Sequence, residues 1–226
     1  AFTGAGVSAL SGIAPFRGAG GLFEGEGGFL MEKVFYIEEF EKDPEFFYKT
    51  AGPFIYTAHE KTPSVVHTAL AALEEQGALK AVITQNIDGL HQKAGSRRVI
   101  EMHGSPAFHY CLRCAGIRLP YTEAAPLALA GLFPRCPQCG RILKPAITFY
   151  GEALPLEAHR AACEEAQRAD LLLILGTSLE AYPAADIPHM VLRGGGKLVI
   201  VNQSPTPLDS QAFLRFDSLE EVFARL

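Results

Sequence analysis

The sequence lacks an excess of basic side chains. Its 20 Lys and Arg residues are outnumbered by 25 Asp and Glu residues, so the formal net charge is -5 and the pI is near 5.8. A protein that binds nucleic acid in general needs a basic face to displace counterions from the phosphates. The composition therefore argues against direct nucleic-acid binding, but it leaves room for a local basic groove that holds an acidic ligand.

Long apolar runs are also absent. No stretch approaches the roughly 20 apolar residues that cross a bilayer, and no signal peptide is visible, so we expect no membrane association. With 226 residues and 48% hydrophobic content, the chain can bury one large domain with a smaller one inserted in it. The first residues, Ala1-Phe2-Thr3, are typical of the end of a strand, and we expect the natural protein to begin earlier.

Cysteine is scarce, and four of the five cysteines form two C-x-x-C pairs, Cys111/Cys114 and Cys136/Cys139. This spacing lets two knuckles gather around one tetrahedral zinc ion. We expect a structural zinc, because a catalytic zinc keeps a coordination position open. A fortuitous disulfide or a redox C-x-x-C pair is the alternative. With Cys163 alone left over, the sequence argues against a disulfide framework and indicates a reducing, cytoplasmic setting.

Three short apolar runs are typical of central strands in a parallel sheet: residues 79–84, 171–176 and 198–202. Helical patterns over residues 65–76 and 156–168 precede the first two. This alternation predicts an α/β fold, with a Rossmann-like doubly wound parallel sheet and a smaller zinc-binding and helical lobe.

Two stretches break the alternation and are expected to form that smaller lobe. Residues 18–60 are rich in Gly, Phe and Glu and predict a helical flap, whereas residues 105–144 contain both cysteine pairs and predict the zinc-binding module. The Rossmann-like domain is then expected to comprise residues 1–17, 61–104 and 145–226.

Small or polar residues follow each predicted strand, where ligands of doubly wound sheets bind. The four segments are Gly4-Ala5-Gly6, Gln85-Asn86-Ile87-Asp88, Gly176-Thr177-Ser178 and Asn202-Gln203-Ser204. They fit a dinucleotide site, and the first glycines would let backbone amides approach a phosphate. The usual Rossmann fingerprint is nevertheless incomplete, because no glycine lies three residues after Gly6.

A polar loop and a histidine suggest chemistry at this edge. Gln85, Asn86 and Asp88 follow a buried strand; Asp88 alone could simply cap the next helix, but that leaves the two amides unexplained. His103 is a candidate general base, and the alternative is an ordinary partly buried histidine.

Taken in order, the motifs resemble the sirtuins of bacterial or archaeal type, which are NAD-dependent protein deacylases. The resemblance spans essentially the whole chain. It rests on Gly4-Ala5-Gly6-Val7-Ser8, Ser11-Gly12-Ile13, Phe16-Arg17, Thr84-Gln85-Asn86-Ile87-Asp88, Met102-His103-Gly104, the four cysteines, Phe149-Tyr150-Gly151-Glu152, Gly176-Thr177-Ser178-Leu179 and Val199-Ile200-Val201-Asn202.

This resemblance implies a protein-lysine deacetylase that transfers the acetyl group from lysine to ADP-ribose and releases nicotinamide. It implies that His103 deprotonates a ribose hydroxyl, that Asn86 helps to organise the ribose, and that NAD is the co-substrate beside one structural zinc. The cofactor-binding residues that it implies are Gly4, Ala5, Gly6, Ser8, Phe16, Arg17, Gln85, Asn86, Ile87, Asp88, Gly176, Thr177, Ser178, Asn202, Gln203 and Ser204.

The implied partner is an acetylated-lysine peptide, extended between the lobes and paired with the segments 149–152 and 179–182. The substrate-binding residues implied are Phe149, Gly151, Glu152, Leu179 and Ala181. Because the resemblance demands no site shared between subunits, we expect a monomer.

The chain departs from the sirtuin pattern at two positions. Pro15 stands where an acidic residue is usual, and Ala181 where a valine is common. No arginine occurs between Arg17 and Arg97, so a charged acyl group would lack a partner. Four alternatives stay open: a deacylase of longer apolar acyl groups, a sirtuin-like mono-ADP-ribosyltransferase, a non-catalytic zinc-ribbon adaptor or NAD sensor, and an NAD dehydrogenase.

Overall fold

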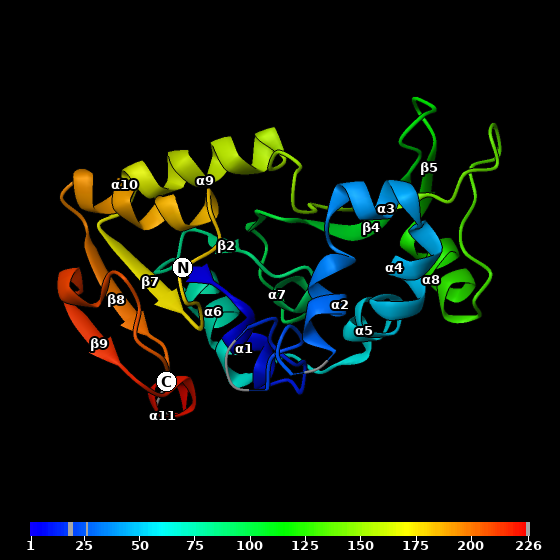
Figure 1. Cartoon of the computed structure of the whole chain (residues 1–226). Coiled ribbons are helices and arrows are strands. Elements are labelled where there is room, and N and C mark those ends of the chain that lie inside the picture. Colours follow the sequence, from blue (N-terminus) through cyan, green and yellow to red (C-terminus); the bar gives the residue numbers. More distant parts are fainter. Residues whose placement is uncertain (18–19, 26, 225–226) are drawn as a thin grey trace.

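A computed structural model describes residues 1–17, 20–25 and 27–224 of the chain. The predicted flap, residues 18–60, includes residues 18, 19 and 26, which lie outside the described residues, as do the last two of the segment 145–226. The described residues form two lobes (Figure 1). A parallel sheet with its helices makes the large lobe, and short helices with a small sheet make the small lobe.

Six parallel strands form the sheet of the large lobe, in the order β3-β2-β1-β7-β8-β9. The order runs outward in both directions from β1 and β7, which makes the sheet doubly wound and confirms the predicted fold class. The strands are β1 (Phe2–Thr3), β2 (Val82–Thr84), β3 (Val99–Glu101), β7 (Leu171–Leu175), β8 (Lys197–Val201) and β9 (Leu214–Phe216).

Helices cover both faces of this sheet. α9 (Leu156–Arg168) and α10 (Ile187–Arg193) lie on one face, and α1 (Ala5–Ala9), α6 (Val65–Glu75) and α11 (Leu219–Phe223) lie on the other (Figure 1). Successive strand residues point to opposite faces, so Ile174 joins the core under α9 whereas Leu175 joins the core over α6. Both faces are therefore apolar, which explains why these strands have continuous apolar runs.

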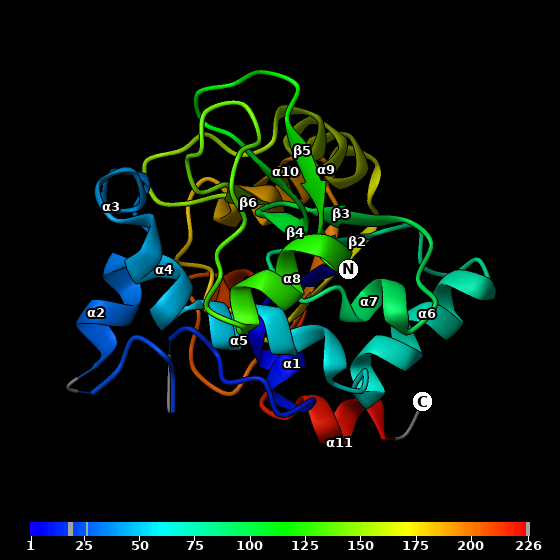
Figure 2. The same cartoon turned by 90° about the vertical axis from the view of Figure 1, so that its right-hand side faces the viewer.

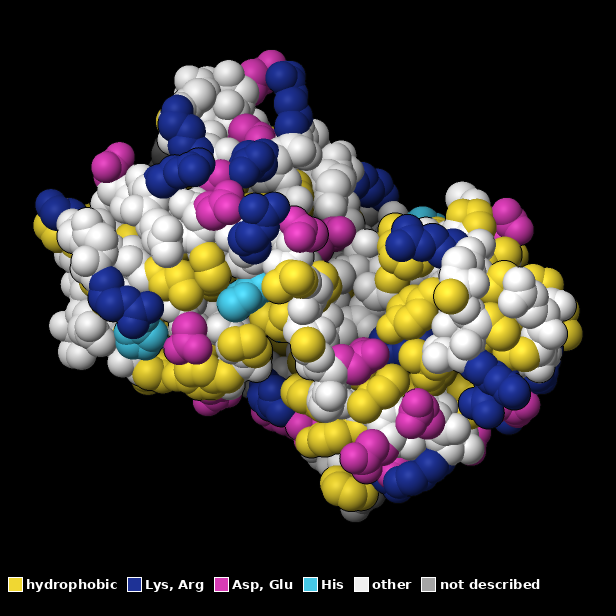
Figure 3. Space-filling view, turned by 90° about the horizontal axis from the view of Figure 1, so that it is seen from above, with side chains coloured by type: hydrophobic (Ala, Val, Ile, Leu, Met, Phe, Trp, Pro, Cys, Tyr) yellow, Lys and Arg dark blue, Asp and Glu magenta, His cyan; other side chains and the backbone are white. Residues whose placement is uncertain are grey.

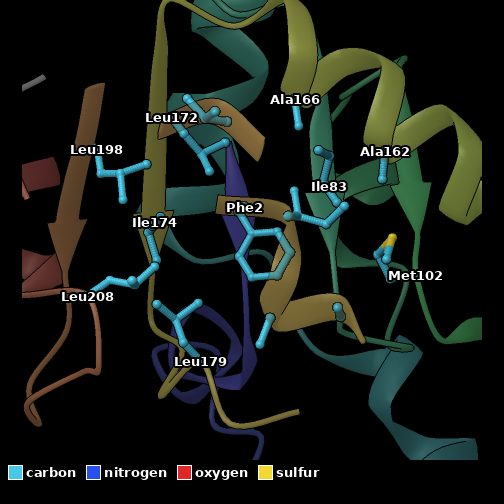
Figure 4. Close-up of a cluster of buried hydrophobic side chains, with 14 of the residues drawn as sticks. Phe2, Ile83, Met102, Ala162, Ala166, Leu172, Ile174, Leu179, Leu198 and Leu208 are labelled. Carbon is cyan, nitrogen blue, oxygen red and sulfur yellow. The ribbon is translucent and has the colours of Figure 1, made fainter. Parts of the chain in front are cut away.

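Small side chains let α9 approach the sheet closely. Figure 4 shows Phe2 of β1 between Ile83 of β2 and Ile174 of β7, with Ala162 and Ala166 projecting from α9 above. The two alanines are four residues apart and therefore share one helix face, and both are almost fully buried. This packing fixes the position of β1, whose carboxyl end leads directly into the polar site.

The small lobe joins two segments that are far apart in the sequence. Phe47 and Tyr48 from the flap share one buried cluster with Ala125 and Phe133 from the cysteine-bearing segment. Figure 2 shows α5 and α8 of these two segments side by side. The elements are α2 (Gly28–Lys33), α3 (Ile37–Lys42), α4 (Pro44–Thr50), α5 (Gly52–Thr57), α8 (Tyr121–Leu129) and an antiparallel sheet β5-β4-β6 of Arg118–Pro120, Gly104–Tyr110 and Lys144–Ile147.

The lobe boundary differs from the predicted one at residue 145. β6 continues the small sheet to Ile147, because it pairs with β4 along its length and places Gly104 opposite Ile147. Ile147 and Phe149 also belong to the buried cluster of the small lobe. Strand pairing, which leaves no mark in the local sequence, therefore sets this boundary.

Of the remaining elements, the 3-10 turn η1 (Ala58–Glu60) connects α5 of the small lobe to α6 of the large lobe. The others lie in connections within the large lobe: α7 (Leu90–Lys93) between β2 and β3, η2 (Ala184–Asp186) between β7 and α10, and η3 (Asp209–Gln211) between β8 and β9. Seen from the side of α9 and α10, an indentation separates the two lobes (Figure 3). Within the described part of the chain, no helix has the length and apolar character needed to cross a membrane.

Candidate active site

The ends of β1, β2, β7 and β8 bring the four predicted segments to one edge of the sheet. Two of them touch backbone to backbone: the Gly4 amide donates to the Leu175 carbonyl at 3.0 Å, and the Gly6 amide donates to the Gly176 carbonyl at 2.8 Å. A Cβ on Gly6 would lie 2.6 Å from the Gly176 Cα, and Gly176 itself has a φ of +60°. These glycines are therefore required by the contact between two loops, a reason that is independent of any phosphate.

Asn86 ties the first two segments together. Its Nδ2 donates to the Gly4 carbonyl and to the Ser8 Oγ, each at 3.0 Å. The Ser8 hydroxyl in turn donates to the Asp88 Oδ2 at 2.6 Å. The other oxygen of Asp88 accepts from the Leu90 amide at 2.9 Å, at the start of α7. The N-cap of α7 is Gly89, not Asp88 as the alternative interpretation had it, but the Asp88 carboxylate binds the first amide of the helix and also belongs to the polar network.

Gln85 reaches across β1 to the third segment. Its Nε2 donates to the Thr177 Oγ1 at 2.9 Å. The same hydroxyl oxygen accepts from the Leu179 amide at 3.2 Å, and Leu179 is held at a φ of 59°, a backbone conformation that a leucine seldom adopts. Strained residues of this kind cluster at functional sites.

His103 lies beside this network with its ring orientation fixed. Its Nδ1 is 2.8 Å from the Gln85 carbonyl oxygen, and because a carbonyl only accepts, Nδ1 carries the proton. Nε2 then keeps its lone pair. Burial lowers the pKa of His103, and the hydrogen bond to Gln85 opposes that shift. A neutral imidazole with a free lone pair is the form that a general base requires.

A pocket opens between the polar network and the flap. Its polar floor comes from Ser8, Asn86 and Asp88, and its other walls are apolar. Phe16 contributes to these walls and packs against the rings of Phe23, Phe35 and Phe54, at centroid distances of 5.3, 5.5 and 5.8 Å. The lining residues are Ala5, Ser8, Ile13, Ala14, Phe16, Phe54, Ile55, Ala58, Asn86, Ile87 and Asp88. Of these, Ile13, Ala14, Phe54, Ile55 and Ala58 were not among the predicted cofactor-binding residues.

Arg17 lies apart from the pocket lining. Its guanidinium donates to the Glu32 carboxylate at 2.6 Å and to the Tyr150 hydroxyl at 3.2 Å, and it lies over the Phe23 ring. Arg17 is thus held by the small lobe in this structure.

The fourth segment is stabilised by a residue that sequence reasoning missed. The Asn202 Nδ2 donates to the carbonyl of Ser204, two residues further along the chain, at 2.7 Å. Gln203 and Ser204 are exposed. Arg215 on β9 donates to the Asn202 carbonyl at 2.9 Å and also pairs with Asp209. An arginine on an edge strand carries no local signal for this role, because only the sheet order brings β9 beside β8.

Of the predicted substrate-binding residues, two are buried and one is turned inward. The Phe149 and Leu179 side chains are almost fully buried in the cores of the small and large lobes, respectively. The Glu152 carboxylate binds the Lys144 Nζ at 2.8 Å. Gly151 is exposed, and Ala181 is half-buried.

The cysteine pairs converge in the small lobe. The sulfur atoms of Cys111, Cys114, Cys136 and Cys139 all lie within 4.8 Å of one another. Backbone amides of Arg113 and Cys114 point at the Cys111 Sγ, at 3.4 and 3.3 Å, which stabilises a thiolate there. Four thiolates in one closed cluster fit a tetrahedral zinc ion and leave no position open for chemistry.

The fold and the site define an α/β enzyme with a pocket at the switch point of a parallel sheet and a separate four-cysteine module. The model of the Sir2 family matches residues 4–183. An NAD-dependent protein deacetylase of Thermotoga maritima is 43% identical over 223 residues, which cover 99% of this chain and 89% of that protein. The chain belongs to the Sir2 family, and the resemblance seen in the motifs is confirmed.

Solved Sir2 structures agree along the whole chain. A complex with a deacetylated p53 peptide and 3'-O-acetyl-ADP-ribose matches with a TM-score of 0.91 at 42% identity, over 99% of this chain and 89% of that one. A complex with a p53 peptide and NAD+ matches with a TM-score of 0.88 at 42% identity and the same coverage.

Proposed function

We propose that this protein is an NAD-dependent protein-lysine deacetylase, which transfers the acetyl group from lysine to ADP-ribose and releases nicotinamide. The observation that carries the proposal is His103, held with Nδ1 on a carbonyl and Nε2 unprotonated, beside a polar network at the switch point. The relatives support it, since one is a deacetylase and a solved neighbour holds a deacetylated peptide with an acetylated ADP-ribose.

In this proposal, His103 accepts a ribose hydroxyl proton at Nε2, and the Gln85 carbonyl stabilises the imidazolium that forms. Asn86 orients the ribose from a position fixed by Gly4 and Ser8. NAD supplies the ADP-ribose that accepts the acetyl group. The remaining residues of the predicted cofactor set would hold it along the sheet edge.

The aromatic wall serves to exclude water. Phe16 is held by three ring contacts and lines the same pocket as Ser8, Asn86 and Asp88, so it would suppress competing hydrolysis at the reacting centre. The flap contributes Phe54, Ile55 and Ala58 to the same pocket, and no arginine is among the described lining residues. The sequence has no arginine between Arg17 and Arg97 to pair with a charged acyl group, which supports acetyl or longer apolar acyl groups over charged ones.

The four cysteines would hold a zinc ion that stabilises the small lobe and takes no part in the reaction. We propose further that the enzyme acts as a monomer in the cytoplasm, where thiolates stay reduced. Equilibrium sedimentation in the presence of reductant tests the oligomeric state.

The deciding experiment is mass spectrometry of a reaction with NAD and an acetyl-lysine peptide, beside a control without peptide. We expect nicotinamide release that depends on the peptide, together with O-acetyl-ADP-ribose. If the acetyl group stays and a protein instead gains the mass of ADP-ribose, the enzyme is a mono-ADP-ribosyltransferase. Butyryl and succinyl peptides in parallel reactions measure the acyl preference, and faster turnover of the succinyl peptide would contradict the apolar assignment.

A further inference from the structure

One lysine of the small lobe is completely buried. Lys144 begins β6, and its side chain has 0% exposure, whereas the other lysines that form ion pairs are between 43% and 65% exposed. A buried ammonium group costs several kcal/mol of desolvation unless it is paired and fully hydrogen-bonded. A charged side chain at such a buried position needs a specific role to offset this cost. Neither His103 nor the polar network of Gln85, Asn86 and Asp88 makes a hydrogen bond to Lys144.

The Lys144 Nζ is satisfied on every side. It lies 2.8 Å from the Glu152 Oε2, 2.6 Å from the Ile147 carbonyl oxygen and 3.4 Å from the Tyr110 hydroxyl. It also lies 4.1 Å from the centre of the Phe149 ring, within the range of a cation–π contact. It donates as well to the Pro145 carbonyl at 3.3 Å. Three of the partners, Ile147, Phe149 and Glu152, come from the end of β6 and the segment that follows it, so one ammonium group contacts that segment at both ends.

Glu152 closes that segment into a turn. Besides Lys144, its Oε2 accepts from the Phe149 amide at 2.8 Å, and the Glu152 amide donates back to the Phe149 carbonyl at 3.0 Å. The Tyr110 hydroxyl donates to the Oε1 at 3.4 Å. Both carboxylate oxygens therefore face the protein interior.

The outer side of this turn connects the flap to the catalytic histidine. The Tyr150 amide donates to the Phe35 carbonyl at 2.7 Å, and the Tyr150 carbonyl accepts from the Ile37 amide at 3.0 Å. Just before it, the Thr148 amide donates to the His103 carbonyl at 2.8 Å. The turn thus touches the flap on one side and the backbone of the general base on the other.

We infer that Lys144 is a positioning residue, which holds the turn of residues 149–152 as one wall of the peptide groove. Glu152 acts with it from inside the turn and does not bind the peptide through its carboxylate. This inference rests on the proposed function, since it assumes that the acyl-lysine peptide lies along residues 149–152. It requires the turn to affect peptide binding more than NAD binding, because the network of Gln85, Asn86 and Asp88 lies on the large lobe.

The test compares steady-state kinetics for three variants with the zinc-loaded wild type. In Lys144→Met, we expect the KM for the peptide to rise about tenfold or more while the KM for NAD changes less than about twofold. Because removing one partner of a buried ion pair can prevent folding, Lys144→Met/Glu152→Gln, which removes both charges, is the second variant. Lys49→Met is the matched control, since Lys49 also pairs with a glutamate and lies over a phenylalanine ring, but on the surface.

Hydrogen exchange at the Tyr150 amide provides a readout that does not need activity. We expect faster exchange in either Lys144 variant and no change in Lys49→Met. A folded, zinc-loaded double variant with an unchanged KM for the peptide would overturn the inference, and so would an equal rise of both KM values. If the wild type itself releases no nicotinamide with the peptide, the proposed function fails, and unchanged exchange at Tyr150 would then refute the role of Lys144 separately.

Discussion

The two lobes hold their polar groups in place by different means. In the large lobe, Asn86 and Gln85 bind neighbouring loops whose positions follow from a continuous six-stranded sheet. In the small lobe, the sheet has three strands, and four thiolates of two distant pairs must lie within 4.8 Å of one another. Protein contacts suffice for the first arrangement, whereas four adjacent thiolates repel one another unless a cation binds them. The catalytic edge is therefore built into the fold, and the module beside it depends on a metal.

The largest effect is expected from removing the metal. Cys136→Ser should lose zinc and unfold the small lobe, because the binding free energy of a structural zinc is also folding free energy, on the order of 10 kcal/mol in zinc-finger peptides. Metal analysis and hydrogen exchange measure both, and α9 should stay protected. Cys163→Ser, on α9 of the large lobe, is the control. A stable, zinc-free, active Cys136→Ser variant would refute the structural zinc.

Replacing His103 should slow the chemical step and leave the fold unchanged. His103→Ala is expected to lower kcat about 10²–10⁴-fold, with zinc content and thermal unfolding unchanged. His189→Ala, which changes a histidine on α10 of the same lobe, is the control and should retain full activity. Normal turnover by His103→Ala would remove this residue from its proposed role.

Acid should weaken the large lobe through a buried histidine pair. The rings of His67 and His91 lie 4.5 Å apart, and burial, with the neighbouring His67, lowers the pKa of His91 to about 3. A histidine in the unfolded chain has a pKa near 6.5, so between about pH 6.5 and pH 3 the unfolded chain binds a proton at His91 that the folded chain does not bind. The free energy of unfolding should thus be level above about pH 6.5 and fall toward pH 3 by up to about 1.4 kcal/mol per pH unit.

Urea unfolding of the wild type and of His91→Gln at pH 7, 6 and 5 measures this contribution. The variant should show a smaller loss of stability between pH 7 and pH 5 than the wild type. Equal losses in the two proteins would show that His91 does not carry the effect.

The smallest effect concerns one hydrogen bond between the flap and β4. The Tyr56 hydroxyl lies 2.5 Å from the His109 Nε2, and both side chains are fully buried. Tyr56→Phe leaves that nitrogen without its partner and should cost about 1 kcal/mol, measured by chemical denaturation. Tyr36→Phe, where the tyrosine is exposed, should be neutral. A neutral Tyr56→Phe would mean that the bond does not stabilise the small lobe.

The confirmed predictions depend on signals that are local in the chain. The apolar runs at 171–176 and 198–202 correspond to β7 and β8, and the helical pattern at 156–168 coincides with α9. The C-x-x-C spacing likewise predicted a metal cluster without any knowledge of the fold. Each signal is carried by neighbouring residues, since a buried strand, an amphipathic helix and a zinc knuckle each need particular side chains at short spacing.

Contacts between residues that are far apart in the sequence could not be predicted from such local signals. Arg215 supports the turn after β8 only because β9 is its neighbour in the sheet. Pro145 falls in the small lobe because β6 pairs with β4. Glu152 was expected to lie in a segment that pairs with the peptide, and the sequence carried no signal for the contact of its carboxylate with Lys144 from inside the turn.

The sequence by itself determined the fold class, the order of the polar segments and the four thiolates, because each depends on residue types at short spacing. Only the tertiary structure decided which residues meet across the fold. It set Gly6 against Gly176, the Asn86 amide against Ser8, and Lys144 against Glu152. Such contacts depend on how strands are ordered and how lobes pack, and sequence separation carries no information about either.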